Sequence, residues 1–267
     1  MTGISLDLAG VVAGVRHRAP LVHCITAAVS MNLVADVLLA AGARPMMTET
    51  EAEAPAMDAV ADTLLVNLGS LSVDGAAGIE PTVAAARAGA RPWVLDPAAV
   101  GVAPVRTRLA ARVLPERPAA VRGNASEVLA LARRGTGGRG ADATDATEAA
   151  LDAALCLARE YDTVVAVSGA VDLITDGTRI IRVRNGHPLL TRVTGTGCSL
   201  GALVAACAAV ADPLVAALTA TVWLGLAGER AAARAAWPGS FRVAVIDELA
   251  ALSPADVAAG ALLEEAG

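Results

Sequence analysis

The sequence contains no lysine, so all 21 of its cationic side chains are arginine. A Walker A loop requires a lysine on the phosphates and a Schiff base requires a lysine amine, so both are excluded. Aromatic residues are also scarce, with three Trp, one Tyr and one Phe, which leaves little surface for stacking nucleic-acid bases. The net charge of −6 does not favour the basic face of a nucleic-acid interface. We therefore expect no nucleic-acid partner.

The four cysteines are scattered along the chain, without a CxxC pair and without nearby histidines spaced as further metal ligands. This spacing indicates neither structural zinc nor a disulfide framework. The N-terminus lacks the basic and apolar pattern of a signal peptide. The apolar stretch 200–228 is divided at Asp212-Pro213 into pieces too short to span a bilayer core of roughly 30 Å. We expect a cytoplasmic protein without a membrane segment.

Apolar residues are abundant, at 55 % of 267 residues, and they alternate between strand-like and helix-like runs. The expected strands are 20–26, 43–47, 63–69, 92–97, 119–122 and 163–168, followed by a hairpin around Asp176-Gly177. The expected helices are 4–18, 30–41, 57–64, 75–89, 106–114 and 145–160, with one more after residues 123–127, two apolar helices after Cys198 and one near the C-terminus. Residues 135–143 are expected to form a glycine-rich loop. The alternation predicts an α/β fold, a mostly parallel doubly wound sheet with helices on both faces, as a single domain over residues 1–267.

Several residues with possible chemical roles fall at the ends of expected strands, namely Met47, Asn67, Asp96, Arg122, Ser168 and Thr194. Ligands of doubly wound folds bind beyond these ends, so we expect one site there. Asp96 suits the water-rich shell of Mg²⁺, and it equally suits a turn that begins at Asp-Pro. Asn124 and Glu127 have the spacing of a helix cap, while Arg122 beside them could grip a phosphate chain.

The stretch that begins at Gly195 precedes an apolar helix. Glycine lets the backbone turn tightly and lets a ligand approach, and a helix N-terminus directs N–H groups at an anion. We expect a phosphate cradle at Gly195, Thr196, Gly197 and Cys198, with a thiol that loses its proton more easily than free cysteine. The alternative is a glycine-containing loop that merely precedes a core helix.

Five ordered blocks resemble the hydroxyethylthiazole kinase family of the ribokinase-like superfamily. They are PLVHCIT at 20–26, GARPMM at 42–47, LDPAAVG at 95–101, VRGNASE at 121–127 and GTGC at 195–198. GGRG at 137–140 and TDG at 175–177 extend the resemblance, which covers about residues 15–245. It implies a ribokinase-like fold and phosphorylation of 4-methyl-5-(2-hydroxyethyl)thiazole by ATP and Mg²⁺ in thiamine salvage. It further implies a homotrimer with active sites at subunit interfaces.

The resemblance also implies a role for individual residues. The thiazole would contact Met47 and Gly195, ATP would contact Arg122 and Ser168, and Mg²⁺ would lie near Asp96 and Glu127, through water. The anion hole would be Gly195, Thr196, Gly197 and Cys198, with Cys198 as the catalytic residue, either as base or as the group that positions the hydroxyl. Ala27 and Asp36 stand where the family usually has asparagine, which leaves strict thiazole specificity open.

Other functions compatible with these residues differ in the chemistry they require. A related kinase of the same fold would act on another small alcohol, such as hydroxymethylpyrimidine. A cysteine-dependent hydrolase or acyltransferase would use Cys198 as nucleophile and would need a histidine base, for which the sequence offers only His23 or His187. His23 lies inside an expected apolar strand, where a buried, hydrogen-bonded histidine is the simpler interpretation. A non-catalytic sensor would bind thiazole or nucleotide without releasing ADP.

Overall fold

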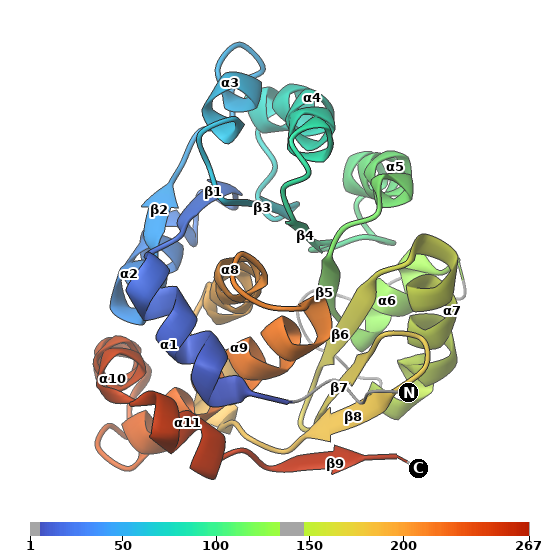
Figure 1. Ribbon diagram of the computed structural model, residues 1–267. Helices are drawn as coiled ribbons and strands as arrows, with labels where there is room; N and C mark the ends of the chain where they lie inside the picture. The colour runs from blue at the N-terminus through green and yellow to red at the C-terminus, as the bar shows by residue number, and fades with distance from the viewer. Residues whose placement is uncertain (1–5, 134–146, 267) are drawn as a thin grey trace.

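The computed structural model describes residues 6–133 and 147–266, which form a nine-stranded sheet flanked by helices (Figure 1). The strand order is β2-β1-β3-β4-β5-β6-β7-β8-β9, and the neighbours from β2 to β6 pair in parallel. The remaining pairs are antiparallel. The strands are β1 Leu21–Ile25, β2 Arg44–Met46, β3 Thr63–Asn67, β4 Trp93–Asp96, β5 Ala120–Asn124, β6 Val164–Ser168, β7 Asp172–Thr175, β8 Ile180–Val183 and β9 Leu263–Glu265. The predicted α/β fold with a mostly parallel sheet is confirmed.

Helices cover both faces of the sheet (Figure 1), as predicted. One face packs against α1 Leu8–Arg18, α2 Met31–Ala41, α8 Thr196–Ala208, α9 Pro213–Ala232, α10 Pro238–Ala251 and α11 Pro254–Ala259. The other packs against α3 Ala54–Asp58, α4 Val73–Ala88, α5 Pro104–Val113, α6 Ala125–Leu131 and α7 Leu151–Tyr161. Short 3₁₀ helices lie at η1 Leu114–Glu116, η2 Thr147–Ala150 and η3 Pro188–Arg192.

The central strands are buried on both faces, which explains why their sequences read as continuous apolar runs. On β3, Leu65 packs into the cluster that contains α8, while Leu64 and Val66 pack into the cluster that contains α4. Successive side chains of a strand point to opposite faces, and a parallel sheet covered by helices therefore needs apolar residues at every position.

Some elements differ from the sequence-based expectation. α3 runs from Ala54 to Asp58 rather than from 57 to 64, because Pro55 occupies its first turn, a position that proline favours. Thr194 lies in a turn before α8 and not at a strand end. The described part of the expected helix 145–160 begins with η2. The expected loop 135–143, the GGRG block and residues 4–5 of the expected first helix lie outside the described residues.

β9 and α11 at the end of the chain were not predicted as separate elements. β9 pairs antiparallel with β8, although its sequence Leu263–Glu265 contains only one apolar residue. Two arginines support it, since Arg184 Nε donates to Glu264 at 2.6 Å and Arg179 Nε donates to Glu265 at 2.7 Å. Cross-strand and neighbouring ion pairs thus hold a strand that apolar periodicity does not reveal.

The apolar stretch 200–228 forms two helices, as predicted, because Asp212 begins a new helix between them. Its side chain accepts a hydrogen bond from Leu214 N at 3.0 Å, and Pro213 takes the first position of α9. Among the helices of the described residues, none combines the length and the apolar character needed to cross a bilayer.

Candidate active site

Four polar residues predicted for the site meet at one edge of the sheet, where the parallel strands end. The register of β3 and β4 places Asn67 beside Asp96, and β6 ends at Ser168 next to β5. Arg122 lies two residues before the end of β5 and connects them. Its guanidinium donates to Ser168 Oγ from Nε at 3.1 Å and from the terminal nitrogen at 3.0 Å, and it contacts Asp96 Oδ2 at 3.4 Å.

Asp96 is a buried carboxyl group whose ionisation the surrounding protein opposes. Removal from water raises its pKa to about 7, and the positive charge of Arg122 offsets only part of that effect. The negative charge of Glu127 adds to the rise. A buried carboxylate that is only partly compensated favours the approach of a further cation.

The N-terminus of α8 lies against this group. Gly195 precedes the helix with a φ of +97°, in the left-handed region that favours glycine. A Cβ atom there would also lie 2.8 Å from Ser30 Cβ, and a Cβ atom on Gly197 would lie 2.7 Å from the Arg122 guanidinium. The glycines therefore allow α8 to begin directly beside Arg122.

The first turn of α8 leaves the N–H groups of Thr196, Gly197 and Cys198 without acceptors inside the helix. The Ser199 N–H is the first to be used, since it donates to the Gly195 carbonyl at 2.8 Å. Helix N–H groups and an arginine thus converge on one point, which is the arrangement that binds a phosphate. The four residues predicted as an anion hole form the start of α8, and that role stays a prediction.

Cys198 does not have the easily ionised thiol that we expected from its helix position, and that prediction was wrong. The side chain is half-buried, and its pKa is raised above the ordinary value, first by burial and then by the charge of Asp96. The nearby polar side chains of Ser30 and Asn67 and the charge of Arg122 oppose the rise without reversing it. Cys24 and Cys207 are fully buried, and burial raises the pKa of both thiols.

Glu127 forms the helix cap that its spacing allowed. Its Oε2 accepts from Asn124 N at 2.9 Å, while its own N–H donates to Asn124 Oδ1 at 2.9 Å. Its second carboxylate oxygen accepts from Ala99 N at 2.9 Å, which ties the loop after Asp96 to α6. The negative charge of Glu127 raises the pKa of both Asp96 and Arg122. The capping residue therefore also contributes to the electrostatics of the site.

Met47 lies at the opposite end of the same sheet edge, directly after β2, and packs half-buried against the cluster that contains α2 and α8. Four strand spacings separate β2 from β5, or roughly 19 Å at about 4.8 Å per strand. The site therefore has two halves. Met47 belongs to one, Arg122 and Ser168 belong to the other, and the start of α8 lies between them.

Three residues that were not assigned a role belong to the site. Asn67 Oδ1 accepts from Gly69 N at 2.8 Å, which turns its NH₂ group toward Asp96 and Cys198, and this buried group has no hydrogen-bond partner within the described ranges. Ser30 contacts Gly195 and Cys198. Burial raises the pKa of Asp172 to about 6, and its charge acts on Arg122. Only Asn67 carried a signal in the sequence, its place at a strand end.

The two departures from the family pattern occupy different places. Ala27 is buried, and its carbonyl accepts from Ser30 N at 3.0 Å and from Ser30 Oγ at 3.1 Å. Asp36 lies partly exposed within α2. A Cβ atom on Gly69, whose N–H donates to Asn67, would come within 3.0 Å of Ala27. Of the two substituted positions, Ala27 is therefore the one beside the site.

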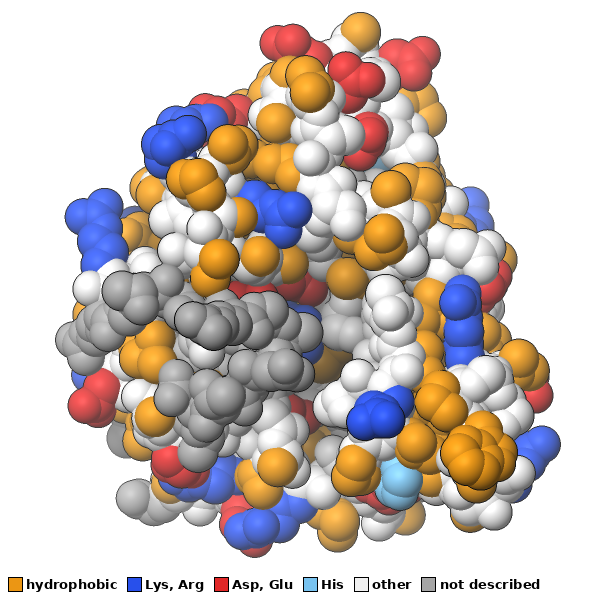
Figure 2. All heavy atoms as spheres, turned by 180° about the vertical axis from the view of Figure 1, so that it is seen from behind, with side chains coloured by type: hydrophobic (Ala, Val, Ile, Leu, Met, Phe, Trp, Pro, Cys, Tyr) orange, Lys and Arg blue, Asp and Glu red, His pale blue; other side chains and the backbone are white. Residues whose placement is uncertain are grey.

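On the face shown in Figure 2, the described arginine side chains lie apart from one another, with acidic and apolar groups between them. The two candidate histidines are engaged elsewhere: His23 is buried against Thr48 and Asp58, and His187 accepts from Leu189 N at 3.2 Å. A cysteine hydrolase would need one of them beside Cys198.

A mostly parallel sheet that presents a helix N-terminus, an arginine and a buried carboxylate at its carboxyl edge is the architecture of a ribokinase-like kinase. A sequence model of the hydroxyethylthiazole kinase family matches residues 12–255, and the chain belongs to this family. Hydroxyethylthiazole kinase of Cereibacter sphaeroides is 51 % identical over 251 residues, covering 94 % of this chain and 96 % of that protein. The corresponding enzyme of Clavibacter sepedonicus is 52 % identical over 244 residues, covering 91 % and 89 %.

Solved structures support the same assignment. Hydroxyethylthiazole kinase from Pyrococcus horikoshii OT3 superposes with a TM-score of 0.90 at 37 % identity, covering 97 % of this chain and 99 % of that one. Pyridoxal kinase from Staphylococcus aureus, solved with AMP-PCP and pyridoxal, gives a TM-score of 0.61 at 15 % identity, covering 79 % and 87 %. The second likeness concerns the fold alone.

Proposed function

We propose that this chain transfers the γ-phosphoryl group of ATP to the hydroxyl of 4-methyl-5-(2-hydroxyethyl)thiazole, a step of thiamine salvage. The observation that carries the proposal is the start of α8, whose free N–H groups face Arg122 beside Asp96. Phosphoryl transfer depends mainly on positioning and on neutralisation of charge. This site supplies both. The reaction would take place in the cytoplasm, where ATP is available, within a single kinase domain.

The two halves of the site suggest where each substrate binds. Arg122 and Ser168 would hold the phosphates of ATP, with the fork of the guanidinium matching their oxygens. The thiazole ring would lie against Met47, whose polarisable side chain suits a small sulfur-containing ring. Gly195 would let the hydroxyethyl group approach the backbone closely. The hydroxyl would then lie at the start of α8, in line with the γ-phosphoryl group.

The residues present fit a magnesium ion held largely through water. The described residues contain no cluster of three or more His, Cys, Asp or Glu side chains able to hold a metal, so a cage built only of protein ligands is not available there. Mg²⁺ does not need one, because it keeps most of its water and binds through one or two carboxylates and the substrate phosphates. Asp96 and Glu127 would supply those carboxylates. When bound, the ion would neutralise charge on the phosphate oxygens.

Cys198 would position the substrate hydroxyl in this proposal. Its raised pKa keeps the thiol protonated near neutral pH, so it is a poor acceptor for the hydroxyl proton there. Its backbone N–H belongs to the anion hole, while its side chain faces the place where the hydroxyl would attack. The N–H groups of the first turn would stabilise the transferred phosphoryl group as charge develops on it.

Replacement of Cys198 tests this role directly. Cys198→Ala is expected to lower kcat by about 10-fold, less than the 10²- to 10⁴-fold that general-base help typically contributes. Cys198→Asp is expected to match or exceed the wild-type kcat, because a carboxylate facing Arg122 is ionised where the thiol is not. Steady-state kinetics of both variants provide the measurement. A loss beyond 10³-fold in the alanine variant would assign the base role to Cys198, whereas full activity would leave it no catalytic part.

The proposed activity is tested by ADP release with hydroxyethylthiazole, ATP and Mg²⁺. Turnover supports the proposal, and its absence contradicts it. A panel that includes hydroxymethylpyrimidine reports whether Ala27 broadens the choice of alcohol. Ligand binding without ADP release would indicate a sensor, and an acyl group trapped on Cys198 would indicate a hydrolase.

We further propose that the chain forms a homotrimer with active sites at the subunit interfaces. α2 and α10 pack against each other, and they and the residues just before them expose the apolar side chains of Val29, Leu39, Trp237 and Val243. Trp237 is 77 % exposed, which is unusual for so large an apolar side chain. We expect light scattering to give three times the chain mass, and Trp237→Glu to lower both that mass and the activity. A fully active monomer would contradict this proposal.

A further inference from the structure

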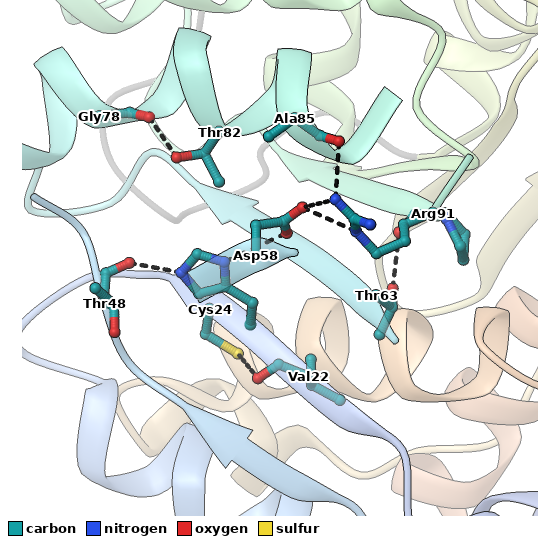
Figure 3. Close-up of polar contacts among 11 residues, drawn as sticks. Val22, Cys24, Thr48, Asp58, Thr63, Gly78, Thr82, Ala85 and Arg91 are labelled. Carbon is teal, nitrogen blue, oxygen red and sulfur yellow. Dashed lines mark hydrogen bonds and ion pairs between the residues drawn. The ribbon is translucent and has the colours of Figure 1, made fainter. Parts of the chain in front are cut away.

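A chain of polar contacts in the interior runs from Arg91 through Asp58 and His23 to Thr48, the residue after Met47 (Figure 3). His23 on β1 and Asp58 at the end of α3 are both fully buried. Asp58 Oδ2 accepts from Arg91 Nε at 3.0 Å and from the Arg91 terminal nitrogen at 2.9 Å. Its other oxygen lies 3.4 Å from His23 Nδ1. Arg91 thus balances the charge that Asp58 brings into the interior, and Asp58 faces the ring of His23.

The second ring nitrogen of His23 holds the loop itself. His23 Nε2 lies 2.7 Å from the Thr48 carbonyl oxygen. A carbonyl oxygen can only accept, so Nε2 carries a proton and donates it. Thr48 directly follows Met47, and the register of β1 and β2 pairs His23 with Met46. The imidazole therefore ties the backbone next to Met47 to strand β1.

α4 holds the same loop from its outer side. Ser72 Oγ donates to Glu49 Oε1 at 2.8 Å. The α4 backbone at Gly78 comes so close to the Glu49 carbonyl oxygen that a Cβ atom there would collide with it. These contacts attach the loop to a surface helix, whereas His23 attaches it to the sheet that carries Asp96 and Arg122. His23 thus fixes the loop relative to the rest of the site.

We propose that His23 is a positioning residue for the thiazole alcohol, acting through the Thr48 carbonyl to hold Met47 against the substrate. The inference rests on the proposed function, in which Met47 contacts the thiazole. Asp58 and Arg91 support the role from behind, because a buried carboxylate persists when it is paired and hydrogen-bonded. The ATP half of the site lies at the other end of the sheet edge and does not depend on this loop.

Two amide substitutions separate the two contacts of the imidazole. In His23→Gln, the longer side chain places an NH₂ group near the position of Nε2 and can still donate to Thr48. In His23→Asn, the shorter side chain can reach toward Asp58 but not to Thr48. Thr63→Val is the matched control, since it removes another buried hydrogen bond to a carbonyl, from Thr63 Oγ1 to Pro92 O at 3.0 Å, at the far end of β3.

The measurement is steady-state kinetics with hydroxyethylthiazole and ATP varied separately, alongside thermal unfolding. His23→Asn is expected to raise the KM for the thiazole alcohol about tenfold, the loss that corresponds to about 1.4 kcal/mol of binding free energy. The KM for ATP should stay within about twofold of the wild type, a change of less than half a kcal/mol. His23→Gln and Thr63→Val should leave both KM values near the wild type, even where they lower the unfolding temperature.

Equal KM values for the thiazole alcohol in the glutamine and asparagine variants would overturn the proposal. So would an equal rise in both KM values of His23→Asn, since that pattern reports general destabilisation. Should His23→Asn fail to fold, His23→Gln decides alone: an unchanged thiazole KM supports the role, and a tenfold rise contradicts it. Wild-type protein that does not turn over the alcohol would fail the proposed function instead, and the inference with it.

Discussion

Asp96→Asn is expected to make the ligand-free protein more stable above pH 7 while lowering the kinase activity by about 10³-fold, the scale of a lost electrostatic contact in a transition state. The gain in stability follows from the pKa of Asp96, which burial raises from 3.8 to about 7. Between these values the folded protein holds a proton that the unfolded chain has released. The stabilising contribution of the protonated group is therefore fully present below about pH 4 and is lost as the pH rises to about 7.

Asparagine has no charge to bury and does not incur this loss. The expected difference in free energy of unfolding grows from near zero at pH 4 to on the order of 2–4 kcal/mol at pH 8. Each kcal/mol corresponds to roughly 2–4 °C in the unfolding temperature of a domain of this size. Melting curves at several pH values provide the measurement, and Asp152→Asn on the exposed side of α7 is the control. An asparagine variant less stable than the wild type at pH 8 would contradict the buried-charge argument.

The same pKa predicts the pH dependence of the reaction. If the ionised carboxylate is the active form, kcat/KM of the wild type should rise with pH through about 7 and then level off. Asp96→Asn should show no such rise in its residual activity. A wild-type profile that is flat between pH 6 and 8 would show that the ionisation of Asp96 does not control the reaction.

Arg122→Met is expected to lower kcat/KM for ATP by roughly 10³-fold, because one side chain contacts Ser168, Asp96 and the start of α8. Methionine fills a similar volume but cannot bind phosphate. It also leaves Asp96 without its nearest cation, so the pKa of Asp96 should rise further and the activity profile should shift to higher pH. The KM for the thiazole alcohol should change much less than the KM for ATP.

Arg122→Lys should recover only part of the loss, since a single ammonium group cannot reproduce the fork that contacts Ser168. Arg87→Met is a suitable control, because the Arg87 side chain forms an exposed ion pair with Glu116 at 3.8 Å, a kind of contact that contributes little. It should remain fully active. An Arg122→Met protein with an unchanged KM for ATP would remove Arg122 from the ATP site.

The location of the site could be predicted from the sequence because strand ends carry a local signal. Apolar runs that stop at Asn67, Asp96 and Ser168 mark the carboxyl edge of a parallel sheet, and Gly195 marks the turn that begins α8. The order of strands in the sheet has no such local signature, since β2 lies outside β1 while β3 lies inside it. That order is what separates Met47 from Arg122.

The ionisation of Cys198 could not be predicted in the same way. The position at a helix N-terminus is local and favours the thiolate, but Asp96 reaches the thiol only through the packing of α8 on β3 and β4. Burial and the charge of Asp96 then raise the pKa of the thiol. Ser30 and Asp172 were missed for the same reason, because only the folded chain brings them to Gly195 and Arg122.

The short strand β9 has a further consequence for how molecules of this protein meet. β8 would otherwise be the last strand on its side, with a row of unpaired N–H and C=O groups open to any extended chain. β9 pairs with these backbone groups of β8. Its glutamates, which accept from Arg179 and Arg184, place charge along the outer edge of the sheet. A chain shortened before Leu263 would expose β8, Ile180–Val183, as an apolar edge strand. Exposed edge strands of this kind pair with other chains and lead to aggregation.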